Sequence, residues 1–113
     1  ANSSKTLNSI IEKTAKEINM PYVKGNTFCN EAFDGYLDDI PAFINRFPKD
    51  LNIIACEMEA FALFYMADYF KKNASCLLTV ADSYYKNQSS TAEDREKSLK
   101  NMIVLALESA INL

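Results

Sequence analysis

The feature that most constrains the fold is a continuous apolar run over residues 74–81, which ends at an acidic residue, Asp82. The run shows no alternation of apolar and polar side chains. This pattern is typical of a strand covered on both faces, as in a parallel sheet. Parallel strands are joined by helical crossovers, so the run predicts an α/β fold.

The flanking segments follow the order expected of such a fold. Apolar residues at helical spacing predict a first helix, which Ser3 or Ser4 caps and which Met20-Pro21 ends. A Ser90-x-x-Glu93 capping box predicts a long last helix. The other elements expected are strands at 22–28 and 51–55, a short helix at 41–47 after Asp38 or Asp39, a helix at 57–72, and loops at 30–39 and 83–89.

The last helix is expected to reach about Ile111 and to bury one apolar stripe. The stripe consists of Leu99, Met102, Ile103, Ala106, Ala110 and Ile111. No repeat or linker divides the chain, so residues 1–113 are predicted to form a single domain.

Two carboxylates, Glu57 and Glu59, stand at the head of a second apolar segment, residues 55–64. Burying a carboxylate without a partner is costly in free energy, so an acid within an apolar segment usually caps a helix, pairs with a cation or binds a ligand. Residues two apart point to nearly opposite faces of a helix, so they are not a simple acid pair unless the first turn is unwound. Either both favour the positive end of the helix dipole, or one or both accept hydrogen bonds from ligand hydroxyls.

Composition excludes several classes of function. The net charge is −3, with no basic face for phosphate backbones, so nucleic-acid binding is not expected. No run is long enough to span a bilayer and no signal peptide opens the chain, so we expect a cytoplasmic protein without membrane contact. Cys29, Cys56 and Cys76 are interpreted as buried, reduced thiols. His is absent and no metal-ligand cluster is present, so no metal is expected.

Asp82 lies at the strand edge where open α/β sheets bind ligands. It either caps the next turn or, between apolar walls, holds a raised pKa and acts as a general acid. Arg95 either reaches Asp82 through a return of the loop or forms a surface salt bridge with Glu93, Asp94 or Glu96.

Four aromatic residues border the two loops. Phe28 and Phe33 flank the first, and Tyr84 and Tyr85 lie in the second. Each pair is either part of the core or a platform on which a flat heterocycle stacks.

Four segments then form a recognisable series: Cys-Glu-Met-Glu-Ala at 56–60, Leu-Thr-Val-Ala-Asp at 78–82, Thr-Ala-Glu-Asp-Arg-Glu-Lys-Ser at 91–98, and Asn-Met-Ile-Val-Leu-Ala-Leu-Glu-Ser at 101–109. Gly25-Asn26-Thr27-Phe28 and Phe33 precede them. The series resembles the C-terminal half of the bacterial, hexameric type of purine nucleoside phosphorylase. The Glu-Met-Glu core is shared across the wider nucleoside phosphorylase and nucleosidase superfamily, whereas the Thr-Ala-Glu-x-Arg segment is more specific to the phosphorylase branch.

This resemblance implies the C-terminal half of a three-layer α/β/α fold with a central mixed sheet. It also implies a transferase of purine salvage, which cleaves the N-glycosidic bond of purine (deoxy)ribonucleosides with inorganic phosphate as co-substrate and no other cofactor. The implied assembly is a homo-oligomer, a hexamer built as a trimer of dimers.

The resemblance further implies a role for each matching residue. Asp82 matches the acid that protonates purine N7 as the bond breaks, and Arg95 matches the arginine that assists this proton transfer. Ala81 stands where the family usually has Ser, which removes one hydroxyl near the base. The implied substrate-binding residues are Phe33 near the base, Cys56 as an apolar wall, Glu57 beside the nucleoside, Met58 along the sugar, and Glu59 as acceptor of the ribose hydroxyls.

The family's phosphate site lies in its N-terminal half, which has no counterpart in this sequence. We therefore expect base and ribose contacts without a phosphate site, an open sheet edge, and the missing N-terminal half as a partner. Three interpretations remain: part of a purine nucleoside phosphorylase, a nucleosidase of the same superfamily that uses water, or a non-catalytic α/β module. The segment 91–95 favours the first over the second.

Overall fold

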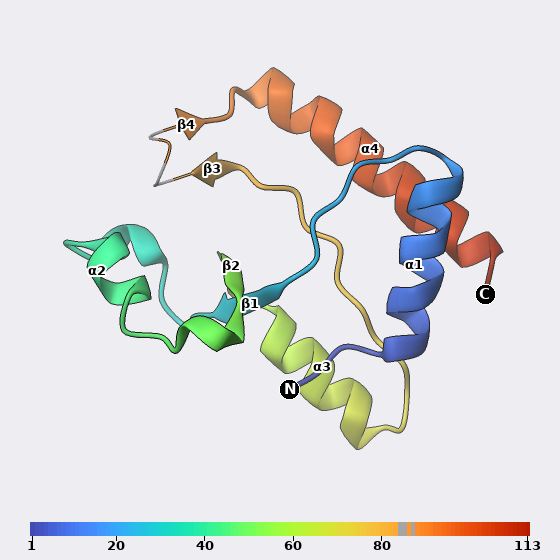
Figure 1. Cartoon of the computed structure of the whole chain (residues 1–113), viewed down its shortest axis with the longest axis horizontal. Coiled ribbons are helices and arrows are strands. Elements are labelled where there is room, and N and C mark those ends of the chain that lie inside the picture. Colours follow the sequence, from blue (N-terminus) through green and yellow to red (C-terminus); the bar gives the residue numbers. More distant parts are fainter. Residues whose placement is uncertain (84–85, 87) are drawn as a thin grey trace.

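The computed structural model describes residues 1–83, 86 and 88–113. Helices and strands are interspersed along the chain (Figure 1). They are α1 (Lys5–Glu17), β1 (Asn26–Cys29), α2 (Ile40–Ile44), β2 (Ile53–Glu57), α3 (Ala60–Tyr69), β3 (Asp82–Ser83), β4 (Gln88–Ser89) and α4 (Ala92–Ile111), with short 3-10 helices at Asp34–Tyr36 and Lys49–Leu51. The mixture of helices with a small parallel sheet confirms the predicted α/β class.

Side-chain caps fix the start of the first two α-helices, as the sequence predicts. Ser4 Oγ accepts the N–H of Leu7 at 3.3 Å in front of α1. Asp39 Oδ1 accepts the N–H of Ala42 at 2.9 Å in front of α2. In each case the cap satisfies an N–H that has no partner within the helix.

Two helices end earlier than predicted because each closes with a left-handed residue. Asn19 (φ 52°) follows α1, and Lys71 (φ 54°) follows α3. The next residue then donates its N–H back into the helix: Met20 to the Ala15 carbonyl, and Lys72 to the Ala67 carbonyl, each at 2.8 Å. This is the Schellman arrangement, which satisfies carbonyls that the helix end leaves unpaired.

β1 and β2 form a parallel pair, and both begin later than predicted. The register pairs Asn26 with Ile53, Thr27 with Ala55, Phe28 with Cys56, and Cys29 with Glu57. Just before β2, Asn52 is left-handed (φ 46°), and its carbonyl accepts the Asn26 N–H at 3.1 Å. Pairing therefore starts at this point, and the carboxyl ends of both strands meet at Cys29 and Glu57.

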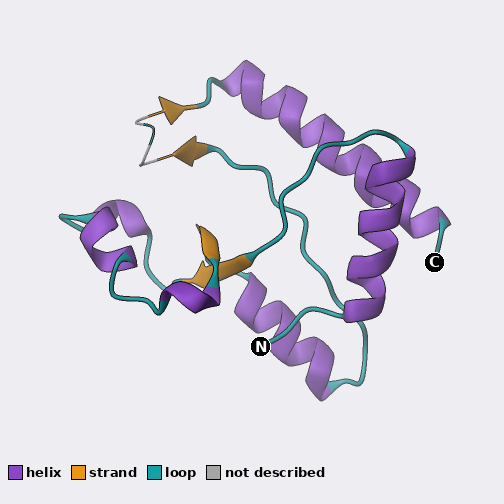
Figure 2. Cartoon of the chain, in the orientation of Figure 1, coloured by secondary structure: helices purple, strands orange, loops and turns teal. Residues whose placement is uncertain are grey.

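Residues 74–81 are not a strand within the part of the chain that the structure describes, so this prediction is wrong as to hydrogen bonding. Figure 2 shows them as a long loop between α3 and β3. The prediction that both faces are covered is also wrong, since Leu78 and Val80 are 48% and 71% exposed. A strand requires a neighbour, and β1 and β2 pair only with each other. The loop expected at 83–89 instead contains the antiparallel pair β3–β4.

The capping box of α4 lies one residue later than predicted. Thr91 Oγ1 accepts the Asp94 N–H at 3.1 Å, and Asp94 Oδ2 accepts the Thr91 N–H at 3.3 Å. Ser90, the predicted cap, instead donates its hydroxyl to the Ala81 carbonyl at 2.6 Å. Its side chain thereby joins the β3–β4 hairpin rather than the helix.

α1 and α4 pack against each other through a narrow contact. It buries Ala15 of α1 and Leu105 of α4, and Asn112 Nδ2 donates to Thr14 Oγ1 at 3.1 Å. The stripe predicted to be buried on α4 is largely open, with Ile103 52% exposed. No helix in the described residues is long and apolar enough to cross a membrane.

Thr91→Ala is expected to lower the free energy of unfolding by about 1 kcal/mol, because it removes the side-chain oxygen that caps α4. Glu93→Gln is the matched control, since the Glu93 side chain forms an exposed ion pair with Lys97 across one turn, at 3.0 Å, and takes no part in the cap. Urea unfolding followed by circular dichroism at 222 nm measures both variants. Equal losses, or a larger loss in Glu93→Gln, would contradict the cap assignment.

Candidate functional site

The candidate site is built on the carboxyl ends of the paired strands β1 and β2. These ends bring Cys29 and Glu57 side by side, and the chain then turns through Met58 and Glu59 into α3. The carboxyl edge of a parallel sheet is where α/β folds bind ligands. The sequence-predicted residues Cys56, Glu57, Met58 and Glu59 are all brought to this edge.

Glu57 is held by both of its carboxylate oxygens. Oε1 accepts the hydroxyl of Thr27 on β1 at 3.0 Å. Oε2 accepts the N–H groups of Glu59 at 2.7 Å and of Ala60 at 2.6 Å. The helix predicted from residue 57 therefore begins at Ala60, because Glu57 ends the strand and satisfies the first N–H groups of the helix from outside it.

These bonds set the ionisation of Glu57. Partial burial raises the pKa of its carboxyl, but hydrogen bonds from the Ala60 and Glu59 N–H groups, the Thr27 hydroxyl and the Cys29 thiol outweigh this effect. The net pKa is lowered from the ordinary value, because each donor favours the charged form. Glu57 is thus an ionised structural group at neutral pH.

Glu59 is placed quite differently. It is exposed, and it occupies the N-cap position of α3 without capping it. Among the described residues, its carboxylate accepts one hydrogen bond, from the N–H of the adjacent Met58 to Oε2 at 3.1 Å. Met58 is itself 45% exposed. The lone pairs of Glu59 that remain are open to hydroxyl donors. Of the two acids, only Glu59 has acceptor capacity to offer a ligand.

The thiols near this edge are less buried than predicted. Cys29 and Cys56 are half-buried, Cys76 is exposed, and all three are free. Burial raises the pKa of Cys56, and the charges of Asp34 and Glu57 add to the effect. Burial also raises the pKa of Cys76, together with the charges of Glu57 and Glu59. Cys76, in the segment 74–81, is therefore within electrostatic range of the two glutamates.

Asp82 and Arg95 belong to a second group, on the β3–β4 hairpin. Asp82 lies opposite Ser89 and is exposed, so it does not have the apolar walls that the sequence suggested. The Ser90 N–H donates to the Ala81 carbonyl at 2.9 Å, and Arg95 Nη2 donates to the Ser90 carbonyl at 3.1 Å. Arg95 is thus fastened beside the hairpin that carries Asp82.

Among the described residues, no salt bridge joins Arg95 to any of its predicted partners, which are Asp82, Glu93, Asp94 and Glu96. No ion pair joins Arg95 to Asp82, and Glu93 pairs with Lys97 instead. The hairpin also lies apart from the β1–β2 edge in the fold (Figure 1). The structure therefore shows two separate groups of candidate residues rather than one closed site.

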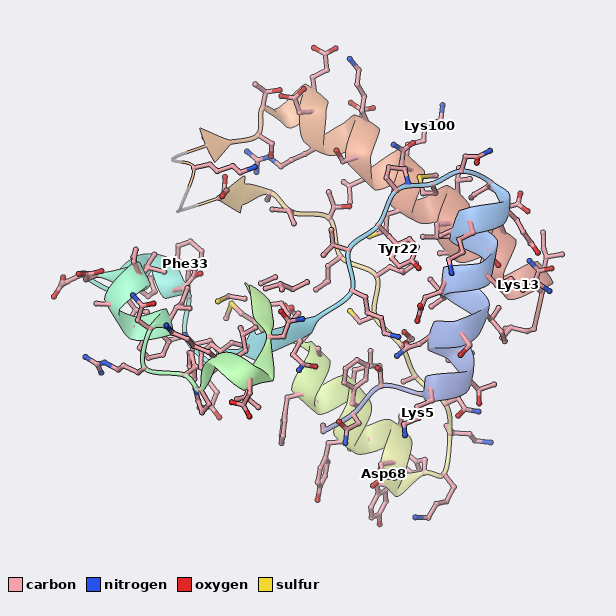
Figure 3. All side chains as sticks on the ribbon, in the orientation of Figure 1. Lys5, Lys13, Tyr22, Phe33, Asp68 and Lys100 are labelled. Atoms are coloured by element: carbon pink, nitrogen blue, oxygen red, sulfur yellow. The ribbon has the colours of Figure 1, made fainter. Side chains whose placement is uncertain are left out.

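The aromatic residues of the first loop divide between the two predicted roles. Phe28 packs on Phe43 and Phe47, with ring centroids 5.5 and 4.6 Å apart, so it belongs to the core that holds α2. Phe33 is 55% exposed and meets only the ring of Tyr36, at 5.7 Å. In Figure 3 Phe33 projects from its loop. Of Phe28 and Phe33, it is Phe33 whose ring is exposed enough for stacking.

Tyr84 and Tyr85, the other candidate aromatics, lie outside the described residues. Among those described, no group of three or more Cys, Asp or Glu side chains could hold a metal ion. Thr27 and Cys29 were missed as parts of the site. They could have been found from the two predicted strands, because parallel pairing brings the residues near the carboxyl ends of both strands together.

Comparison with known proteins gives a consistent result along the chain. Residues 1–111 match the sequence model of a family described as "Phosphorylase superfamily". "Purine nucleoside phosphorylase DeoD-type" of Mycoplasma pneumoniae is 33% identical over 111 residues, which cover 98% of this chain and 45% of the relative. Its counterpart in Mycoplasma genitalium is 36% identical over 106 residues, covering 94% and 43%.

A third relative, "Purine nucleoside phosphorylase DeoD-type 2" of Vibrio vulnificus, is 35% identical over 101 residues, covering 89% of this chain and 41% of the relative. The chain thus spans less than half the length of these relatives.

Glu57→Gln is expected to lower the free energy of unfolding at pH 7 by about 1 kcal/mol, because a neutral amide accepts weaker hydrogen bonds than a carboxylate. The folded-state pKa of Glu57 is lowered from 4.5, so its stabilisation is present above that pH and is lost as pH falls through the folded value. The difference between the two proteins should therefore vanish in acid. Urea unfolding from pH 7 to pH 3 measures it.

Glu31→Gln, at an exposed loop position, is the matched control. It should follow the native chain at every pH. A stability difference between the native chain and Glu57→Gln that does not change with pH would contradict a charged cap.

Proposed function

The chain belongs to the phosphorylase superfamily, and from this premise we propose that it carries the base- and ribose-binding part of a purine nucleoside phosphorylase. The observation that carries the proposal is the similarity to relatives of that name over 89–98% of the chain. In the proposed reaction, a phosphate oxygen bonds to C1′ of the (deoxy)ribose as the bond from C1′ to purine N9 breaks. The electron pair of that bond leaves with the base, and the products are the free base and (deoxy)ribose 1-phosphate.

Glu59 is the proposed acceptor for the ribose hydroxyls. Its exposure and its single weak contact to Met58 leave it free for two O–H donors, and charge-assisted bonds of this kind are strong. The exposed Met58 side chain is proposed to lie along the sugar. Glu57 stands beside them and, through its bonds to the Glu59 and Ala60 N–H groups, fixes the turn that orients Glu59.

Asp82 is the proposed general acid. It transfers a proton to purine N7, so that the base leaves as a neutral molecule rather than as an anion. Arg95 is the proposed assistant to this transfer, and its bond to Ser90 keeps it next to the hairpin. Phe33, with its open ring face, is proposed to stack near the base, and half-buried Cys56 to form an apolar wall.

The relatives are more than twice as long as the part that this chain matches. We propose that the phosphate-binding groups belong to the remainder of the family fold, which corresponds to its N-terminal half. The complete enzyme is proposed to be a cytoplasmic homo-oligomer, a hexamer built as a trimer of dimers, that works in purine salvage. Inorganic phosphate is its proposed co-substrate, with no metal or organic cofactor.

Glu59→Gln is expected to weaken adenosine binding by at least about tenfold, because a charge-assisted bond to the ribose hydroxyls becomes a neutral one. Binding of free adenine should change by less than about twofold, which corresponds to less than about 0.4 kcal/mol. Isothermal titration calorimetry with adenosine and with adenine measures the two losses of affinity. Glu31→Gln is the matched control, and equal losses for nucleoside and base would remove Glu59 from the ribose site.

Asp82→Asn is expected to lower kcat for phosphate-dependent cleavage of adenosine or inosine by the native assembly by about 10²–10⁴-fold, because the amide cannot supply the proton. Adenosine binding should persist. Asp68→Asn is the control, at a position on α3 remote from the hairpin in Figure 3. Unchanged turnover in Asp82→Asn would show that another group protonates the base.

A further inference from the structure

Ser90 lies at the junction of the two elements that carry the proposed acid and its assisting arginine. It directly follows β4, which pairs with the strand of Asp82, and it precedes Thr91, the N-cap of α4. Arg95 donates its backbone N–H to the Thr91 carbonyl at 3.0 Å, so it lies near the start of this helix. Figure 1 shows the hairpin running directly into α4. A residue at this junction is placed to set the position of Asp82 relative to Arg95.

Two donors of Ser90 meet one carbonyl oxygen, that of Ala81. The Ser90 hydroxyl donates to this oxygen at 2.6 Å, and the Ser90 N–H donates to it at 2.9 Å. A carbonyl oxygen has two lone pairs, so it accepts both bonds, and both lengths are normal for such bonds. Ser90 and Ala81 are half-buried, so water competes less for these groups than it does at the open surface.

The Ala81 carbonyl is the point at which the chain becomes fixed before Asp82. Among the described residues, the backbone of residues 75–80 forms no hydrogen bonds. The strand that carries the acid, β3, has only two residues, Asp82–Ser83. Its short ladder therefore gives little support on its own, and Ser90 supplies both of the bonds that hold the residue directly before the acid.

The carbonyl of Ser90 makes a third contact, with the side chain of Arg95. Arg95 Nη2 donates to this oxygen at 3.1 Å. A guanidinium carries several N–H donors in a fixed planar fork, so this bond orients the group and leaves other donors for a ligand or for an acid. Ser90 thus holds the backbone beside Asp82 through its hydroxyl and N–H, and the guanidinium of Arg95 through its carbonyl.

We propose that Ser90 is a positioning residue, which holds the Asp82 carboxyl and the Arg95 guanidinium in a fixed relation to each other. The inference rests on the proposed function, because that function makes Asp82 the proton donor and Arg95 its assistant. Ser90 itself does not touch the reacting atoms. A proton donor must be held to within about 0.5 Å, and a displacement of about 1 Å costs about 10²-fold in rate. Removal of the hydroxyl loosens this hold, while the N–H and the carbonyl of residue 90 stay.

The kinetic test is phosphate-dependent cleavage of adenosine by the native assembly. Ser90→Ala is expected to lower kcat about tenfold and to leave KM within about twofold, because the proposed ribose contact of Glu59 lies on a different edge of the fold. Ser90→Thr keeps the hydroxyl and should restore kcat to within about threefold of the native value. Ser98→Ala makes the same change at an exposed position of α4 and is the matched control.

A double variant tests whether Ser90 acts through Asp82. In the Asp82→Asn background, the further change Ser90→Ala should lower kcat by less than about twofold, because the proton donor that Ser90 positions is already absent. A residue that only stabilises the fold would cause the same loss in both backgrounds. The comparison therefore separates a positioning role from a general loss of stability.

Hydrogen exchange tests the contact without catalysis. Because the N–H and the hydroxyl of Ser90 share one acceptor, Ser90→Ala should speed exchange of the residue 90 amide at least about fivefold after correction for the intrinsic rates. Ser90→Thr should exchange at the native rate. NMR detection resolves this single amide.

Several results would overturn the proposal. These are unchanged exchange at residue 90, equal kcat losses in Ser90→Ala and Ser90→Thr, or an undiminished loss in the Asp82→Asn background. Native cleavage of adenosine with faster exchange but unchanged kcat in Ser90→Ala keeps the proposed function and rejects the positioning role. A native assembly that does not cleave adenosine rejects the proposed function and the catalytic part of this inference, and the exchange rate then decides whether Ser90 holds the hairpin.

Discussion

One carboxylate joins the elements on which the candidate site depends. Glu57 ends β2, accepts the Thr27 hydroxyl from β1, and accepts the first N–H groups of the turn into α3. An ionised acceptor at the positive end of a helix is favoured by the helix dipole as well as by these bonds. These hydrogen bonds lower the pKa of Glu57. The Glu57 carboxylate thus joins β1, β2 and the start of α3. Because it also accepts the Glu59 N–H, it helps to fix the backbone position of Glu59.

The two glutamates therefore suit different roles, structural support for Glu57 and the proposed ligand binding for Glu59, and their spacing in the sequence does not reveal this difference. Glu57 has donors on both oxygens, so a ligand hydroxyl would have to displace bonds that hold the turn. Glu59 accepts only one N–H, from its own neighbour, and faces solvent. A ribose acceptor needs free lone pairs on a rigid support. The geometry supports Glu59 as the acceptor and Glu57 as the support.

Features that depend on local chemistry were predictable from the sequence, and features that depend on distant pairing were not. The Ser4 and Asp39 caps follow from residue type and position, and the structure confirms them. The α4 cap moved by one residue because Ser90 and Thr91 both fit the pattern, and only the Ala81 carbonyl, brought close by the hairpin, decides between them. Glu57 was assigned to a helix because nothing local shows that Thr27, 30 residues away, holds it at a strand end. Residues 75–80 form no backbone hydrogen bonds among the described residues, and no local pattern can predict this, because strand pairing depends on residues distant in the sequence.

The position of the proposed catalytic acid depends on the unpaired segment that precedes it. Asp82 follows directly after residues 74–81, and it is exposed on a two-residue strand anchored by Ser90. A general acid must be held within a fraction of an ångström of its target, which a segment without ladder bonds cannot ensure. The same segment carries Cys76, whose pKa is raised by burial and further by the charges of the two glutamates. The path from the proposed ribose-binding edge to Asp82 is thus set by a segment that is anchored only near its ends among the described residues. The two groups of candidate residues are therefore separate in this structure, because the segment that joins them has no backbone hydrogen bonds among the described residues to hold its path.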